Sequence, residues 1–363
     1  MKGGNALARL PQELLEQVVQ EVEADPCDHA TVAAGYRHFL HMNELPPGLF
    51  TPAQARSWMR EKGAFSTNGL ASLCLVSRQL NQLANPRLYR NLDSFHTNTG
   101  WYLLARTLVT RRDLASLVRH LDVDELEVPE DLLPLPIPEV AAYYADQAAL
   151  VPDPSLPADG ITSSDYEEVL EAATAIMASL CPNLETLDCR TYCVSDRDGL
   201  MCGLCMPASM PNLQVLALTH YDSMYGFDLG ELSSLLRAAP NLTTLHLEQA
   251  AAGGLPDDLK LEKVTFVNMR GTIHDGDLIA LLRLCPNAEE LQYECIGPCF
   301  GEDQFGPREA VDAVVTHAPR LKVFGLDLYR WNDMDVDFNT ENMRAAKRML
   351  EGARIPGCSA AVG

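Results

Sequence analysis

Four cysteines lie close enough together in the sequence to suggest a metal site. Cys189, Cys193, Cys202 and Cys205 are spaced C-x3-C-x8-C-x2-C, and tetrahedral zinc takes four thiolates from two such pairs. Cys189, however, occupies an apolar position of a predicted strand, where its side chain points into the core, and the second pair lies where a helix is expected. Cys295 and Cys299 have no second pair, so we expect no metal.

Other patterns begin like functional motifs and then break down. Asp333, Asp335 and Asp337 alternate like the start of a calcium loop, but Phe338 stands where glycine is needed and Arg344 where the closing glutamate belongs. No glycine-rich phosphate loop follows a strand, and neither G-x-S-x-G nor H-E-x-x-H occurs. The sequence therefore predicts no catalytic residue, no cofactor and a protein that is not an enzyme.

The most informative pattern is a string that recurs five times at nearly constant spacing. Each copy has a proline, then a leucine or alanine two residues later, then apolar residues three and five positions further on. A fixed period in this range is typical of a stacked repeat array. The prolines lie 29, 29, 46 and 33 residues apart, with a degenerate copy at 261–266 in the longest gap: Pro182, Pro211, Pro240, Pro286 and Pro319.

Each copy predicts a short strand that follows a helix. Apolar residues two apart, such as Leu216 and Leu218, share one face of a strand. The proline upstream ends the preceding helix, whose apolar stripe is clear at Leu278 and Leu281. With an earlier copy at residues 118–123, we expect about seven strands, each paired only with its neighbours in the stack.

These features resemble the leucine-rich repeat, in the long variety that carries a C-P-N-L signature, as at residues 181–184. The resemblance covers residues 114–328. It implies an α/β fold, a leucine-rich-repeat solenoid of parallel strands with helices on the convex side. The asparagine or cysteine usual after the third apolar position is absent, since Tyr221 and Ala250 stand at two such positions. We therefore expect the internal asparagine ladder to be missing.

The N-terminal region carries a second resemblance. Residues 10–19 and 70–83 predict two helices, and Asn85 is placed to cap a third that has Pro86 at its first position. In order, L-P-x-E-L-L, S-L-x-L-V-S-R-x-L-N-x-L-A and P-x-L-Y-R-N-L resemble an F-box. The two halves are normally contiguous, whereas residues 23–68 intervene here.

An F-box binds a Skp-type linker subunit, which docks on the cullin and RING subunits of a ubiquitin ligase. The resemblance implies a substrate-recognition adaptor of an SCF-type E3 ubiquitin ligase, a non-catalytic subunit that binds a protein substrate. The residues that match the apolar motif and are implied to bind the linker are Leu10, Pro11, Leu14, Leu15, Leu73, Val76, Leu88 and Tyr89.

The substrate is expected on the concave face of the array, where the variable strand positions project. His246 is among them, and we expect it to be an exposed side chain without a catalytic role. The expected substrate-binding residues are Asp188, Arg190, His246, Glu248, Gln292, Glu294 and Asp327.

Three other interpretations stay open. The N-terminal helices could be an ordinary cap on the array, since terminal repeats need one. The chain could be a protein-binding scaffold without a ligase role, if the inserted segment disables the F-box. It could also be an enzyme that uses the cysteine cluster.

The expected domain organisation has three parts. An F-box with its insert at about 23–68 spans residues 1–95, the repeat array spans 96–350 and a tail spans 351–363. The array contains an acidic, proline-rich excursion at 124–164, because residues 120–189 hold 16 acids and no lysine or arginine.

Composition limits the partners and the compartment. The net charge of −22 disfavours nucleic acid and anionic membranes as partners. No apolar run is long enough to span a bilayer, and the N-terminus lacks an apolar signal region. Eleven cysteines without such a signal favour a reducing compartment, cytoplasmic or nuclear, and Cys74, Cys181 and Cys285 are expected to be buried small hydrophobes.

Overall fold

A computed structural model describes twelve stretches of the 363-residue chain: residues 11–23, 67–92, 98–123, 174, 177–191, 210–220, 227–230, 232–252, 254–270, 275–294, 307–327 and 359–362. The acidic excursion, most of the predicted insert and the aspartates near residue 335 lie outside these stretches. So do Leu10 and three of the four clustered cysteines, Cys193, Cys202 and Cys205.

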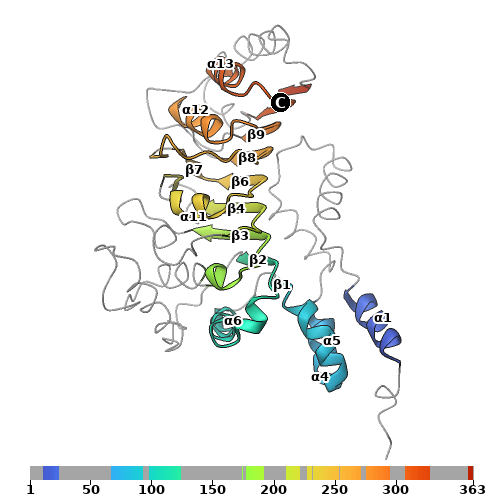
Figure 1. Cartoon of the computed structure of the whole chain (residues 1–363). Helices are drawn as coiled ribbons and strands as arrows, with labels where there is room; N and C mark the ends of the chain where they lie inside the picture. The colour runs from blue at the N-terminus through green and yellow to red at the C-terminus, as the bar shows by residue number, and fades with distance from the viewer. Residues whose placement is uncertain are drawn as a thin grey trace, which may run out of the picture.

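The chain has an α/β fold built on one parallel sheet (Figure 1). Nine strands of the described chain follow one another across the sheet in chain order, so each new unit is added beside the last. The strands are β1 (Asn91–Leu92), β2 (His120–Val123), β3 (Thr186–Thr191), β4 (Val215–His220), β6 (Thr244–Glu248), β8 (Phe266–Arg270), β9 (Glu290–Glu294), β10 (Val323–Asp327) and β11 (Ser359–Val362). A separate pair joins β5 (Phe227–Asp228) to β7 (Ala250–Ala251).

The recurring apolar residues occupy the same register on successive strands. Leu187, Leu216 and Leu245 pair directly across β3, β4 and β6, and the residues two positions later form a second row. Both rows point to the same face, because side chains alternate along a strand. That face is the main core, in which Leu187, Leu216 and Leu245 are fully buried.

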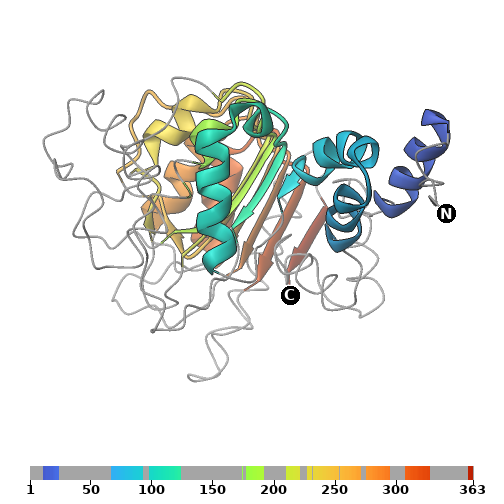
Figure 2. The same ribbon diagram turned by 90° about the horizontal axis from the view of Figure 1, so that it is seen from below.

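In the described stretches, five helices lie on this core face of the sheet (Figures 1 and 2). Three of them end two residues before a repeat proline, at Ala238, Leu284 and His317. Proline ends a helix because it has no backbone N–H to donate and its ring clashes with the preceding turn. The helices are α6 (Asn98–Thr110), α7 (Arg112–Ala115), α11 (Ser233–Ala238), α12 (Asp275–Leu284) and α13 (Pro307–His317).

The sheet is larger than the repeat strings predict. All seven predicted repeat strands are present, and β1 and β11, which were not predicted, extend the described sheet at its two ends. Neither belongs to a repeat string: β1 has two residues, and β11 lies within the segment expected to be a tail. Their pairing depends on the neighbouring strand, which a local pattern does not reveal.

Among the described residues, three helices precede the sheet: α1 (Gln12–Glu23), α4 (Thr67–Val76) and α5 (Arg78–Leu88). The prediction of one helix over 70–83 is wrong, because the chain is extended at Ser77, whose Oγ accepts a hydrogen bond of 3.1 Å from the Leu80 amide. This N-cap begins α5. Asn85 does not cap a third helix; it lies inside α5 together with Pro86, in the last turn.

A different asparagine ladder, not the one expected after the third apolar position, runs along the turns that precede the strands. The side-chain amide of Asn212 donates to the carbonyl of Pro182 at 3.2 Å, and that of Asn241 donates to the carbonyl of Pro211 at 2.6 Å. Asn287 donates in the same way to Glu262 at 2.7 Å. Each unit is therefore tied to the preceding one at the asparagine that follows the repeat proline, a role that the spacing of the repeat string does not predict.

Candidate docking surfaces

The helices α1, α4 and α5 pack on one another as a unit, here called the helix cluster. Its members come from two segments of the chain that residues 24–66 separate. The cluster has its own core, distinct from the core beneath the sheet, formed by Leu15, Val19, Leu70, Leu80 and Ala84. Local sequence patterns predict amphipathic stretches in both segments, though not the boundary between α4 and α5, and the structure brings them together.

The helix cluster leaves large apolar side chains in solvent. On α1, Leu14 is 44% exposed and Val18, one turn later, is also exposed. At the end of α4, Leu75 is 89% exposed and Val76 is exposed beside it. Exposed apolar residues grouped on one small unit are typical of a surface that is covered by a partner.

The other predicted linker residues have different positions. Pro11 is exposed at the start of α1, whereas Leu15 is 1% exposed and holds the cluster together. Leu73 and Leu88 are half-buried against the cluster core. Tyr89 packs against the core of the sheet instead, and this burial raises the pKa of its hydroxyl.

Two exposed residues, Val18 and Leu75, were missing from the predicted linker set. Val18 lies four residues after Leu14, so helical periodicity could have found it. Leu75 follows a residue that faces the cluster core, and only the packing of α4 against its neighbours determines that it points outward.

The helix cluster is joined directly to the sheet. α5 leads within three residues to β1, and the carbonyl of Arg90 accepts hydrogen bonds from the amides of Arg119 and His120, at 2.9 and 3.1 Å. Among the described elements, the cluster lies at the β1 end of the sheet, opposite the face that carries α6 and α11 (Figures 1 and 2). The short hydrogen-bonded connection limits how far the two parts can move apart.

The face of the sheet opposite the main core is here called the open face. Its middle row holds Asp188, His246 and Gln292, as expected from the strand alternation. All three are buried, however, and the expectation that His246 is exposed is wrong: it is 6% exposed. Its ring lies 5.2 Å from that of Phe266 on the next strand, tilted by 52°.

Glu248 lies near the carboxyl end of β6 and forms an ion pair of 2.8 Å with Arg270 of β8. The two side chains are 15% and 18% exposed, so the pair is largely shielded from solvent. Gln249, the next residue, has a φ of 63°, a conformation that costs a residue with a side chain some strain. The side chains of Arg190, Glu294 and Asp327 lie outside the described part.

The described cysteines pack as apolar residues. Cys189 is buried in the second core row, and no group of three or more potential metal ligands occurs within the described ranges. Burial raises the pKa of Cys181 and of Cys285 to about 12. Cys74 is only half-buried, and desolvation raises its pKa as well.

No helix in the described stretches is both long and apolar enough to cross a bilayer. In comparisons with known proteins, no protein-family model matches the chain, and no curated protein matches it either.

Proposed function

We propose that this chain is a leucine-rich-repeat solenoid preceded by an F-box, and that it acts as the substrate-recognition adaptor of an SCF-type E3 ubiquitin ligase. The helix cluster is the F-box and binds the Skp-type linker subunit, which connects it to cullin and RING subunits. The strands β2 to β10 and their helices form the repeat array, whose open face binds a protein substrate. The adaptor itself carries out no chemistry.

The observation that carries this proposal is the meeting of α1 with α4 and α5. An ordinary cap buries its apolar residues against the first repeat. The helix cluster instead buries Leu15 and Leu80 in a separate core and leaves Leu14 and Leu75 exposed. That division suits a unit that folds on itself and keeps an apolar surface for a partner.

The exposed residues are sufficient in number for stable binding. Each leucine or valine that becomes fully buried contributes about 1.5–3 kcal/mol. Among the described side chains of α1 and α4, four such residues are exposed, and a few central anchors usually dominate the affinity of an interface. Leu14, Val18, Leu75 and Val76 are the proposed anchors.

The repeat array supports the second half of the proposal. Its strands form one continuous parallel sheet, and the short connection through β1 joins this sheet to the helix cluster. A substrate on the array is thereby held near the ligase, which raises its effective concentration at the site of transfer. The net charge of −22 suits a protein partner better than nucleic acid or an anionic membrane.

The test is capture of the purified Skp-type linker by the full-length chain. The double variant Leu14→Ala, Leu75→Ala removes two proposed anchors and is expected to weaken capture at least about a hundredfold. Leu103→Ala is the matched control, because Leu103 is 45% exposed but lies on α6, outside the helix cluster. This control is expected to capture the linker as the original chain does.

Two outcomes contradict the proposal. If the original chain captures no linker, the ligase role is wrong and a protein-binding scaffold is what remains. If the double variant and the Leu103 control both bind like the original chain, the helix cluster is not the docking surface. Thermal unfolding of each variant checks that the fold is retained.

A further inference from the structure

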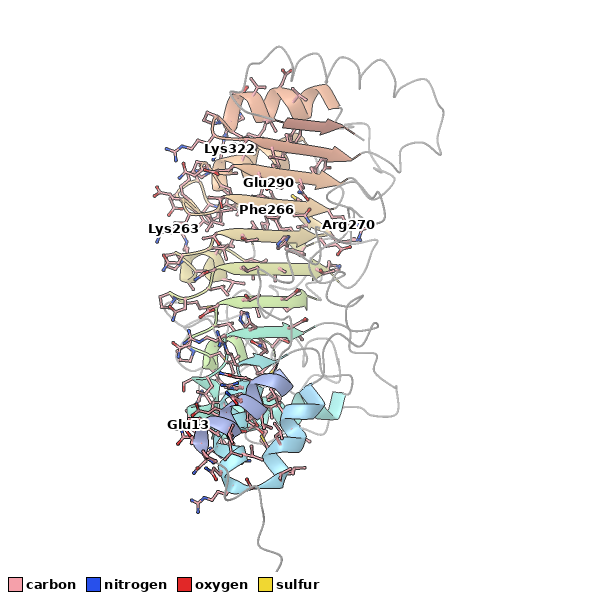
Figure 3. All side chains as sticks on the ribbon, turned by 90° about the vertical axis from the view of Figure 1, so that its right-hand side faces the viewer. Glu13, Lys263, Phe266, Arg270, Glu290 and Lys322 are labelled. Atoms are coloured by element: carbon pink, nitrogen blue, oxygen red, sulfur yellow. The ribbon has the colours of Figure 1, made fainter. Side chains whose placement is uncertain are left out.

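The open face carries an aromatic side chain at the start of β8. Phe266 begins β8, is half-buried, and pairs in register with Thr244 on one side and Glu290 on the other. Figure 3 looks onto this face, with Phe266 and Glu290 on neighbouring strands. The neighbouring His246 ring, at 5.2 Å, supports the ring of Phe266 from one side. An aromatic ring at such a place is a common anchor for a binding partner.

The carboxylate beside this ring is held in place. Gln292 lies two residues further along β9, and its Nε2 donates a hydrogen bond of 2.9 Å to Oε1 of Glu290. Glu290 is half-buried, and within the described ranges no lysine or arginine forms an ion pair with it. The ring and the oriented carboxylate therefore lie side by side on adjacent strands, which are separated by about 4.8 Å.

The charges of the surrounding face are mostly negative. Among the open-face strand residues whose side chains the structure describes, four are acidic and one is basic. The one arginine, Arg270, pairs with Glu248. Asp122 and Asp188 are buried, so Glu290 is the half-buried carboxylate of this group that lies beside the Phe266 ring. The charged residues are Asp122, Asp188, Glu248, Glu290 and Arg270.

We propose that Phe266 and Glu290 form a subsite for an arginine side chain in an extended, basic segment of a protein partner. The guanidinium stacks on the face of the Phe266 ring and donates hydrogen bonds to the Glu290 carboxylate. Arginine fits better than lysine, because its planar group can stack and pair at the same time. The subsite assigns a class of substrate, basic extended segments, to the repeat array. This proposal rests on the proposed function only where it calls that segment a substrate.

Fluorescence anisotropy with labelled peptides tests the subsite on the full-length chain. The probe is a short peptide of alternating arginine and serine, because alternate residues of an extended segment face the same way. Matched peptides carry lysine or glutamate in place of arginine. We expect the arginine peptide to bind most tightly, the lysine peptide more weakly and the glutamate peptide not at all.

Variants separate this subsite from general attraction to an acidic chain. Glu290→Gln is expected to weaken binding of the arginine peptide about tenfold, and Phe266→Leu about threefold. Glu262→Gln removes the same charge from an exposed turn before β8 and is expected to leave binding unchanged. Equal effects of Glu290→Gln and Glu262→Gln, or equal binding of the arginine and lysine peptides, would overturn the assignment.

Linker capture, measured on the same variants, distinguishes the two proposals. If the chain captures the linker but does not bind the arginine peptide, the adaptor proposal stands and the proposed subsite is wrong. If the chain binds the peptide through Glu290 but never captures the linker, the subsite stands and the adaptor proposal is wrong.

Discussion

Glu248 and Arg270 stand opposite each other on neighbouring parallel strands and form an ion pair of 2.8 Å that is largely shielded from solvent. Removing one charge from such a pair leaves the other poorly solvated. We therefore expect Glu248→Gln to lower the free energy of unfolding by about 2 kcal/mol.

The exposed pair of Lys322 and Glu289, at 2.6 Å, is the control for this effect. Glu289→Gln removes the same kind of charge at a solvent-exposed site, where an ion pair contributes less than about 1 kcal/mol. Urea unfolding of both variants measures the difference. Equal losses would show that shielding from solvent does not strengthen the pair on β6 and β8.

The asparagine ladder predicts that substitution by alanine lowers stability at a ladder asparagine but not at the equivalent arginine. Asn287→Ala removes the hydrogen bond to the Glu262 carbonyl and is expected to cost about 1 kcal/mol of stability. Arg320 takes the equivalent place in the last repeat string, after Pro319, and no described hydrogen bond joins it to the preceding turn. Arg320→Ala is thus expected to change thermal stability little, and a loss as large as that of Asn287→Ala would contradict the ladder.

The cap of α5 can be tested with a conservative pair of variants. Ser77→Ala removes the side-chain acceptor for the Leu80 amide and is expected to cost about 1 kcal/mol. Ser77→Asp keeps an acceptor and is expected to retain most of the stability. Thermal unfolding compares the two, and an equal loss in both would mean that the cap is not what stabilises the start of α5.

The buried thiols predict a dependence of stability on alkaline pH. Cys181 and Cys285 stay protonated in the folded chain, where their pKa is about 12, but ionise from about pH 9.0 once the chain unfolds. The unfolded state then binds fewer protons, so stability is fully present below pH 9.0 and falls as pH rises towards 12. The slope is about 1.4 kcal/mol per pH unit for each thiol.

Cys181→Ala and Cys285→Ala each remove one thiol, and each is expected to reduce this slope, whatever its effect on stability at neutral pH. Urea unfolding between pH 9.0 and 10.5 measures it. An unchanged slope in both variants would show that other groups cause the alkaline destabilisation.

The sequence alone determines the repeated units of this protein. Apolar residues two apart define each repeat strand, and the prolines mark where α11, α12 and α13 end, because both signals act within a few residues. The same spacing places Leu187 and Leu216 in one core row. It also predicts amphipathic stretches near the N-terminus, though not the break at Ser77.

Only the tertiary structure decided which of these residues are accessible. Leu14 and Leu15 are adjacent in sequence, yet one is exposed and the other holds the helix cluster together, because α1 packs on helices from a distant segment. His246 is buried beside Phe266 for a similar reason, since that contact forms between strands. Burial depends on contacts between residues far apart in the chain, and a local pattern does not contain that information.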